Sequence, residues 1–386
     1  MAQSCCLKLI VMVLMGVLCK LVQNRVIMLV DFDYFFAQCE ELRNPSIKDK
    51  PVVVGVYSGR TEYSGAVSTS NYVARRYGVK SGIPIFLAKR NLEGLSAVFL
   101  PVDHDYYTKI SENLMQLLGV YASCLEQVSI DEAYLDVTLQ VEGNFEKARL
   151  YAQKIKQDIK IQIGLSLSIG VGPSKLVAKI ACDNQKPDGL TIVKPEEAVD
   201  FLAPLSVDRL LGVGKKTFVR MEHMNIKTIA DLSKFDIQRL IAVFGKALGL
   251  YFHNAANAVD NEPVVEQGEA ESISKIGTLP QDTHDLELLL QKIDELVEIV
   301  YKEVAEKGYS FKTISIYVVN VDLVSKSRSI TLEQSGRDKE VIKRNVRLLL
   351  EKYLAESSLD VRRVGVRVSG FSKEQPQQKQ LSSFFG

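Results

Sequence analysis

Two short acidic segments hold the residues of this sequence that could do chemistry. Asp31 comes where an apolar run at Val26–Val30 ends, and Asp131-Glu132 lies at a similar strand-like edge later in the chain. A buried carboxylate without a partner costs several kcal/mol, so acids in such places need a cation. Oxygen ligands suit Mg²⁺, and three carboxylates can hold two ions that activate a hydroxyl and neutralise a leaving pyrophosphate. The alternative is that these acids only end strands or turns, because acidic dipeptides are common.

The other candidate ligands are weaker. We expect Asp33, Asp136 and Asp183 to be structural rather than metal-binding. The four histidines are scattered, and the six cysteines contain no C-x-x-C pair. The sequence therefore predicts neither a zinc site nor a disulfide framework, and it fits a reducing compartment.

Length and composition indicate a globular protein of several domains. A chain of 386 residues is long enough for two to four domains. Hydrophobic residues make up 46% and charged residues 25%, which excludes disordered and collagen-like proteins. Because the net charge is only +1, any surface that binds nucleic acid must be a local one.

Strand-like and helix-like segments are mixed over the first half of the chain. Apolar runs such as Val26–Val30 and Pro51–Tyr57 are typical of strands buried on both faces. We predict that Asp131-Glu132 joins two strands of a hairpin, Val128–Ile130 and Ala133–Val137. Further strands are predicted at Val98–Pro101 and Gly164–Val171, and helices at Ser70–Tyr77, Tyr106–Leu118, Phe145–Lys160 and Ser174–Asp183. The mixture indicates a sheet domain of the α/β or α+β class.

The second half divides into a helical part and a second mixed domain. From about Pro195 to Asp260 the pattern is helical, and the polar, acidic residues 261–271 are predicted to be an interdomain linker. The strands predicted after the linker are Ser272–Leu279, Thr313–Val321, Ser325–Thr331 and Val361–Phe371, and the helices are Leu286–Lys307 and Lys339–Leu354. The order β-α-β-β-α-β is the split βαβ arrangement.

An apolar stretch precedes the first predicted strand. Lys8 and Lys20 flank the residues from Leu9 to Cys19, which are too few for a bilayer-spanning helix of about 20 residues. A secretory signal would also need a small-residue cleavage site. We interpret residues 1–24 as a translation extension that is not part of the fold. A membrane or partner anchor is the alternative.

The acidic segments belong to longer motifs that resemble the Y-family translesion DNA polymerases, and most closely the archaeal DNA polymerase IV group. The two motifs are Asp31-Phe32-Asp33-Tyr34-Phe35-Phe36-Ala37 and Ser129-Ile130-Asp131-Glu132-Ala133-Tyr134-Leu135-Asp136. Further matches are Asn71-Tyr72-Val73-Ala74-Arg75, Lys175, Lys179, Lys186-Pro187-Asp188-Gly189 and Arg362-Arg363-Val364-Gly365-Val366-Arg367. The likeness covers about residues 25–371.

The resemblance implies an α+β multidomain fold, a right-hand polymerase with an added little finger of the split βαβ kind. The palm would comprise residues 25–34 and 102–193, and the fingers residues 35–101. The thumb would comprise residues 194–260 and the little finger residues 272–371, with a tail at 372–386.

The resemblance also implies the roles of individual residues. Asp31, Asp131 and Glu132, with the backbone carbonyl of Phe32, would bind two Mg²⁺ ions and form the catalytic centre. The incoming deoxynucleoside triphosphate would contact Phe35, Phe36, Thr69, Tyr72, Arg75 and Lys186. Phe36 would be the steric gate, because an aromatic ring under the sugar leaves no room for a 2′-hydroxyl. Without the motif, Arg75 and Lys186 would be interpreted as solvated charges, and Phe35-Phe36 as core aromatics.

Two regions are predicted to bind DNA. Gly212, Gly214 and Lys215 lie in a segment that resembles a helix–hairpin–helix motif, in which backbone N–H groups approach a phosphate. A plain connection between two helices is the alternative. In the last domain the strand-like segments are basic and the first helix is acidic, so we expect the sheet to face phosphates. The residues assigned to this contact are Lys275, Lys326, Arg328, Arg362, Arg363 and Arg367.

The end of the chain resembles the peptide that docks on the replication sliding clamp. The segment from Gln378 to Phe385 fits the pattern Q-x-x-h-x-x-a-a. Gln378, Leu381, Phe384 and Phe385 would make the contact as a hydrophobic anchor on a polar tail. A frayed tail without a partner is the alternative.

These features together predict an error-prone, magnesium-dependent, DNA-directed DNA polymerase that performs translesion synthesis without proofreading. Small residues at Gly65–Ser70 would leave the nascent base pair weakly checked for shape. The predicted partners are primer–template DNA, a deoxynucleoside triphosphate and the sliding clamp, and we expect a cytoplasmic monomer without membrane contact. A non-catalytic DNA- and clamp-binding scaffold and a nucleotidyl cyclase are the rival hypotheses. The retained carboxylates argue against the scaffold, and the two DNA-binding regions argue against the cyclase.

Overall fold

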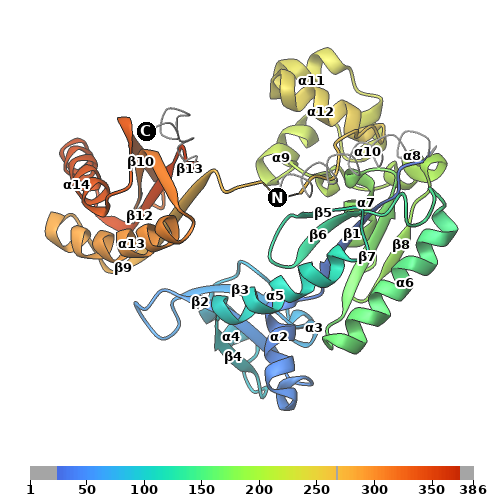
Figure 1. Ribbon diagram of the computed structural model, residues 1–386, viewed down its shortest axis with the longest axis horizontal. Coiled ribbons are helices and arrows are strands. Elements are labelled where there is room, and N and C mark those ends of the chain that lie inside the picture. The colour runs from blue at the N-terminus through green and yellow to red at the C-terminus, as the bar shows by residue number, and fades with distance from the viewer. Residues whose placement is uncertain (1–23, 267, 374–386) are drawn as a thin grey trace, which may run out of the picture. The chain divides into compact units, whose positions relative to one another are not determined.

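The computed structural model describes residues 24–266 and 268–373, so the predictions for residues 1–23 and for the clamp-binding tail lie outside the described residues. Internal contacts divide the chain into two compact units (Figure 1). The larger contains residues 24–55, 67–83 and 87–266, and the smaller contains residues 56–66, 84–86 and 268–373. Within the described residues, no helix is long and apolar enough to cross a membrane.

A five-stranded sheet with the order β5-β6-β1-β7-β8 lies at the centre of the larger unit. Its strands are β1 (Ile27–Phe32), β5 (Cys124–Gln127), β6 (Glu132–Asp136), β7 (Leu167–Gly172) and β8 (Leu190–Ile192). The helices packed on it are α5 (His104–Gly119), α6 (Phe145–Gln162) and α7 (Lys175–Asn184). Met28 and Val30 of β1 share one core cluster with α5 and α6, whereas Ile27 and Leu29 pack against α7. Burial on both faces explains the uninterrupted apolar sequence of β1.

The hairpin before the acidic segment differs from the prediction. The sequence predicted a strand at Val128–Ile130, but β5 ends at Gln127. The N–H groups of Val128 and Ser129 both donate to the carbonyl of Glu132, at 2.9 and 3.2 Å, and so form a bend. The Ser129 hydroxyl donates to the carboxylate of Asp131 at 2.6 Å within the same bend. This local bonding ends the strand early and leaves Asp131 in the connection just before β6.

A smaller sheet with the order β3-β2-β4 follows β1 in the chain. Its strands are β2 (Val52–Tyr57), β3 (Gly65–Ser70) and β4 (Val98–Pro101). The surrounding helices are α2 (Phe35–Arg43), η1 (Pro45–Ile47), α3 (Tyr72–Arg75) and α4 (Ile85–Asn91). The helix predicted at Ser70–Tyr77 is thus a single short turn. It begins after Asn71 because the side chain of Asn71 accepts a hydrogen bond from the Ala74 N–H at 3.0 Å.

The region predicted to be helical consists of short helices around one core. They are η2 (Pro195–Glu197), α8 (Ala198–Leu202), η3 (Val207–Arg209), α9 (Lys215–His223), α10 (Ile229–Ser233), α11 (Ile237–Phe244) and α12 (Lys246–Ala256). The predicted linker begins as an ordered part of the same unit. Val264 is buried against Ile27 and Leu29, and the Val265 N–H donates to the carboxylate of Glu126 at 3.1 Å.

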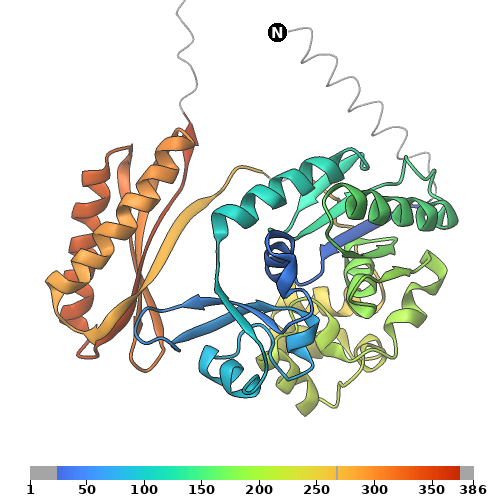
Figure 2. The ribbon, with the colours of Figure 1, turned by 90° about the horizontal axis from the view of Figure 1, so that it is seen from below.

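In the smaller unit, residues 268–373 form an antiparallel sheet with two helices on one face (Figure 2). The elements are β9 (Ser272–Thr283), α13 (Leu286–Glu306), β10 (Tyr309–Asn320), β11 (Ser325–Gly336), α14 (Lys339–Glu356), β12 (Val361–Ser369) and β13 (Ser372–Lys373). The strand order is β11-β10-β12-β9, and β13 pairs with β10. This arrangement confirms the predicted split βαβ order.

Candidate active site and nucleic-acid interface

Strand pairing brings the three predicted carboxylates to one end of the central sheet. In the antiparallel pair of β1 and β6, Asp31 lies directly opposite Glu132. Asp131 precedes β6, and its carbonyl accepts a hydrogen bond from the Phe32 N–H at 2.9 Å. The side chains of Asp31 and Glu132 are only 13% and 14% exposed. Three acidic groups are therefore gathered in a place that is largely withdrawn from water.

Two lysines neutralise this cluster. The Lys186 ammonium lies 2.5 Å from Asp31, and the Lys179 ammonium lies 2.5 Å from Glu132 and 3.6 Å from Asp31. Burial acts to lower the pKa of each lysine, but the carboxylates outweigh it and raise both pKa values above the ordinary range. Both side chains therefore remain cations.

The carboxylates are less well stabilised as anions. Burial raises the pKa of Asp131, and the charge of Asp31 adds to the rise, while a hydrogen bond from Ser129 opposes it. Burial and Asp31 likewise raise the pKa of Glu132 against the opposing effect of Lys179. Adjacent acids with raised pKa values are stabilised by added positive charge.

Hard, oxygen-preferring divalent ions fit this donor set. Among the described residues, no group of three or more His, Cys, Asp or Glu side chains is arranged to hold an ion. In the present arrangement, ammonium groups contact the oxygens of Asp31 and Glu132. An ammonium and a divalent cation are alternative partners for the same carboxylates, so the residues present fit a metal ion. The contact predicted for the Phe32 carbonyl stays a prediction.

The predicted triphosphate ligands come from several elements of the larger unit. The Arg75 guanidinium lies 4.6 Å from the centre of the Tyr72 ring, and its Nε donates to the Ser70 carbonyl at 3.0 Å. Burial raises the pKa of Tyr72, and the charges of Arg75, Lys186 and Asp31 also act on it. Tyr72 is therefore electrostatically coupled to the carboxylate cluster. Thr69 is half-buried on β3.

Phe35 and Phe36 begin α2 and have different surroundings. Phe35 is 2% exposed and belongs to the core, so its side chain does not face a nucleotide and only its backbone N–H at the helix start is available. Phe36 is half-buried, and its ring stacks on that of Tyr107 at 4.4 Å. The Tyr107 hydroxyl donates to Glu40, one turn along α2, at 2.7 Å. Sequence analysis missed this support of the Phe36 ring.

The segment predicted to be a helix–hairpin–helix motif is an exposed loop before α9. Gly212 has a φ of 82°, which favours glycine, and Gly214 is the N-cap residue of α9. A Cβ at Gly214 would meet nothing within 4 Å, so the backbone is open to a ligand. Lys215 follows as the first helical residue and is exposed. An open helix N-terminus next to lysine fits a phosphate.

Strand register sorts the basic residues of the second sheet onto two faces. Arg363 and Arg367 of β12 alternate with Val364 and Val366, which are buried under α13 and α14. The two arginines therefore lie on the face without helices, which we call the open face. Many hydroxyl residues share this face. Arg363 pairs with Thr278, and Arg367 pairs with Ser274 and Ser315. Ser325 and Ser329 of β11 lie one strand further, opposite Val319 and Ser315. Sequence analysis overlooked these hydroxyls, although the alternating serines Ser325, Ser327 and Ser329 at the start of β11 were a visible signal.

Three of the residues predicted to contact DNA do not lie on the open face, where they were expected, but on the face that carries the helices. Their contact with DNA stays a prediction. Lys275, Lys326 and Arg328 are paired with the buried residues Val366, Val318 and Ile316. Lys275 contacts Glu303 of α13 at 3.1 Å, and Arg328 contacts Glu356 of α14 at 2.6 Å. All three cations come from the two edge strands, and Lys275 and Arg328 bind glutamates of the two helices. Arg362, at a register shift in β12, lies 3.7 Å from Asp282.

Lys179 is a residue of the cluster that sequence analysis noted only as part of a motif. It stands four residues after Lys175 in the largely buried helix α7. Lys175 is 7% exposed and contacts Glu126 at 2.7 Å. Two lysines on the buried side of an apolar helix were the available signal, because buried lysines require acidic partners.

Comparisons with known proteins match most of the chain to families and relatives that are DNA polymerases. Residues 30–183 match the impB/mucB/samB family, residues 270–382 match the C-terminal domain of that family, and residues 208–260 match the thumb domain of DNA polymerase-iota. A DNA polymerase IV of Nitrosopumilus maritimus is 44% identical over 94% of this chain and 100% of its own length. A DNA polymerase IV of Methanosarcina acetivorans is 41% identical over 92% of this chain and 98% of its own length.

The similar solved structures are also DNA polymerases. A Y-family DNA polymerase chimaera of Dbh and Dpo4 has a TM-score of 0.86 and 36% identity, and the match covers 90% of this chain and 100% of that one. An insertion ternary complex of Dbh DNA polymerase has a TM-score of 0.66 at 36% identity with the same coverage.

Proposed function

This chain belongs to the impB/mucB/samB family of Y-family DNA polymerases, and we propose that Asp31, Asp131 and Glu132 form its nucleotidyl-transfer centre. It is a DNA-directed DNA polymerase of the translesion kind, and such polymerases use divalent metal ions. The observation that supports the assignment is the pairing of Asp31 with Glu132 across β1 and β6, next to Asp131. We propose two Mg²⁺ ions as the metal, because the donors are all hard oxygens.

The proposed reaction is the nucleotidyl transfer of a DNA-directed DNA polymerase. The primer 3′-hydroxyl attacks the α-phosphate of the deoxynucleotide, a new P–O bond forms, and pyrophosphate leaves. Asp31, Asp131 and Glu132 would hold the metal, whose charge would favour loss of the hydroxyl proton and stabilise the leaving pyrophosphate. Lys186, Arg75 and Tyr72 hold the phosphates by charge and hydrogen bonds. The ring of Phe36 excludes the 2′-hydroxyl of a ribonucleotide.

The DNA would be held by two parts of the chain. The palm would comprise residues 25–34 and 102–193, and the fingers residues 35–101. The two DNA-holding parts would be the thumb, residues 194–260, and the little finger, residues 272–371. The loop at Gly212 and Gly214 and the open face with Arg363 and Arg367 would contact DNA phosphates.

Further partners and the location are also proposals. The tail would bind the replication sliding clamp through Gln378, Leu381, Phe384 and Phe385. The enzyme itself would be a monomer. The free thiols Cys39, Cys124 and Cys182 fit a reducing compartment such as the cytoplasm.

Primer extension tests the catalytic assignment. We expect extension of plain and damaged templates that needs Mg²⁺ and is lost in Asp131→Ala. Asp136→Asn is the matched control, because Asp136 lies at the opposite end of β6 and caps the Thr138 N–H at 3.0 Å. Normal extension by Asp131→Ala, or equal losses in both variants, would contradict the proposal.

A further inference from the structure

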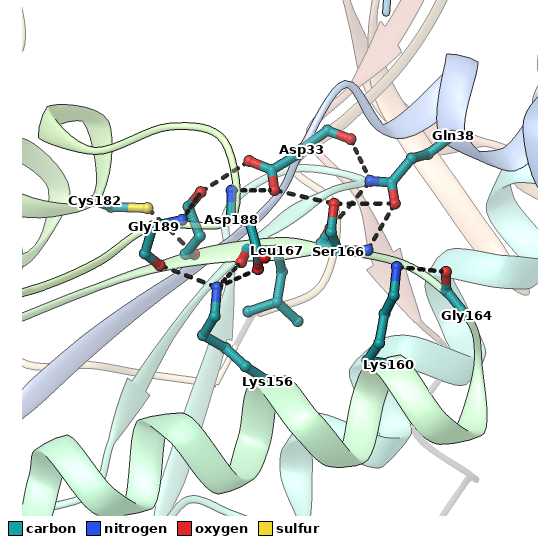
Figure 3. A network of polar contacts seen from close by, with 11 residues as sticks. Asp33, Gln38, Lys156, Lys160, Gly164, Ser166, Leu167, Cys182, Asp188 and Gly189 are labelled. Atoms are coloured by element: carbon teal, nitrogen blue, oxygen red, sulfur yellow. Dashed lines mark hydrogen bonds and ion pairs between the residues drawn. The ribbon is translucent and has the colours of Figure 1, made fainter. Parts of the chain in front are cut away.

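Asp33 is a buried carboxylate outside the proposed nucleotidyl-transfer centre. It is 1% exposed and follows the end of β1 at Phe32. Figure 3 shows it within a network of polar contacts. Its Oδ1 accepts a hydrogen bond from the Ser168 hydroxyl at 2.8 Å. Its Oδ2 accepts from the Ser166 hydroxyl at 3.2 Å and from the Asp188 N–H at 2.8 Å. Asp33 therefore connects the end of β1 to β7 and to the turn that follows α7.

That turn carries Lys186. Residues 185–189 connect α7 to β8 and leave little freedom to the backbone. Asp188 has a φ of 52°, and a Cβ on Gly189 would lie 1.4 Å from the Gln185 carbonyl oxygen. The Lys186 ammonium contacts Asp31 at 2.5 Å and Asp183 at 2.9 Å. The position of this ammonium therefore depends on how the turn is anchored.

The anchoring groups converge on two consecutive residues of the turn. Besides the bond from Asp188 to Asp33, the Gly189 N–H donates to the Ser168 hydroxyl at 3.2 Å. The Lys156 ammonium contacts the Asp188 carboxylate at 2.7 Å and the Gly189 carbonyl at 3.2 Å. Gln38 holds the other side of the network, because its side chain bonds the carbonyls of Asp33 and Ser166 (Figure 3).

We propose that Asp33 is a positioning residue that holds the turn at 185–189, and through it Lys186, in place for the triphosphate. Two residues of the short segment 31–33 would then position Lys186 in different ways. Asp31 contacts the ammonium directly, and Asp33 binds the backbone two residues further along the chain. A carboxylate suits this task, because three donors converge on it and charge-assisted hydrogen bonds are the stronger ones. The inference rests on the proposed role of Lys186 in binding the nucleotide.

A double-mutant cycle tests the positioning role. The nucleotide Kd is measured by titration onto a dideoxy-terminated primer–template, where no reaction follows, and KM and kcat are measured on an ordinary primer. We expect Asp33→Ala to raise the nucleotide Kd and KM about tenfold, with kcat and DNA affinity changed less than about threefold. In a Lys186→Ala background the same substitution should change the nucleotide Kd by less than about twofold, because Asp33 is proposed to act through the Lys186 side chain, which is absent there.

Two serine variants give an independent comparison that perturbs the network less. Both Ser166 and Ser168 donate to Asp33, but of the two only Ser168 also accepts the Gly189 N–H of the turn. Ser168→Ala should therefore raise the nucleotide Kd about threefold, and Ser166→Ala should leave it nearly unchanged. Melting temperatures are recorded for every variant, since a purely structural network would lower stability without changing nucleotide affinity.

Each result decides between stated alternatives. An equal rise in nucleotide Kd in the wild-type and Lys186→Ala backgrounds would overturn the positioning role and leave the role of Lys186 intact. The positioning role is overturned in the same way if the two serine variants behave alike, or if Asp33→Ala lowers only the melting temperature. If Lys186→Ala itself leaves the nucleotide Kd unchanged, the triphosphate role of Lys186 fails together with the inference, while the polymerase activity stands.

Discussion

Asp31 and Glu132 face each other across antiparallel strands, and a single ammonium, that of Lys179, contacts both carboxylates. The sheet thus forces two like charges together and supplies a cation from α7 to offset them. Lysine is a monovalent partner that a divalent ion can replace. This relationship gives the carboxylate cluster two separable properties, one in catalysis and one in stability, and each can be measured.

Glu132→Ala should abolish nucleotide addition and leave DNA binding largely intact. Glu132 is proposed to hold metal and is not among the residues assigned to DNA. Loss of one ligand of a metal site costs several kcal/mol of transition-state stabilisation, which corresponds to a fall in kcat of roughly a thousandfold. Single-turnover extension gives the rate, and fluorescence anisotropy gives the DNA Kd. Near-normal extension would remove Glu132 from the catalytic centre.

Asp131→Asn should stabilise the metal-free protein at neutral pH. The pKa of Asp131 is raised in the folded state, so the folded chain holds this proton more tightly than the unfolded chain does. The cost of ionisation is absent below the ordinary carboxylate pKa and develops as pH rises through the raised value, so stability falls with rising pH. In a chelator near pH 8, removing about 1 kcal/mol of cost should raise the melting temperature by about 2–4 °C.

Two controls for this prediction are measurements at low pH and measurements with added Mg²⁺. Below the ordinary carboxylate pKa, Asp131 is protonated in both the folded and the unfolded chain, so the two proteins should melt nearly together. Mg²⁺ should raise the melting temperature of the wild type more than that of Asp131→Asn, because the ion binds the carboxylate. A variant that melts lower than the wild type at pH 8 in chelator would contradict the idea that this charge is costly in the fold.

Phe36→Ala should weaken discrimination against ribonucleotides. The ring is held by its stack on Tyr107 at 4.4 Å, so it presents a rigid edge rather than a mobile side chain. Its removal should reduce the ratio of kcat/KM for deoxyribonucleotides over ribonucleotides by about tenfold or more, with a smaller effect on deoxynucleotides alone. Phe36→Tyr, which keeps the ring, is the control. An unchanged ratio in Phe36→Ala would show that the residue only fills the core.

The carboxylates could be predicted from sequence because Asp31 and Asp131-Glu132 are set in local motifs next to apolar strands. The split βαβ order was also readable, since its strands and helices are long and periodic. The face on which Lys275, Lys326 and Arg328 lie was not, because a count of charges per strand ignores register, and one residue of shift exchanges the two faces. The contacts of Asp33 with Ser166, Ser168 and Asp188 join segments far apart in the chain, and no local pattern shows them.

Opposite faces of the same sheet should differ in their effect on DNA affinity. The double change Arg363→Ala with Arg367→Ala removes cations from the open face, whereas Lys326→Ala with Arg328→Ala removes the same charge from the helix side. If each open-face arginine neutralises one phosphate, the slope of log K against log salt should fall by about 2 for the first pair and stay nearly unchanged for the second. Equal slopes for the two pairs would contradict the assignment from register.

Removing residues 378–386 should leave distributive synthesis unchanged and abolish stimulation by the sliding clamp. The segment lies beyond β12 and β13, so its loss does not disturb the sheet. Leu381, Phe384 and Phe385 would supply the apolar anchors, and interface energy is concentrated in a few such residues. Tethering raises the effective concentration of enzyme at the primer end, so the gain appears as longer products. Phe384→Ala with Phe385→Ala should reproduce the deletion, and Lys379→Ala with Ser382→Ala, at positions the pattern leaves free, should not. A truncated enzyme that the clamp still stimulates fully would place the main contact elsewhere on the chain.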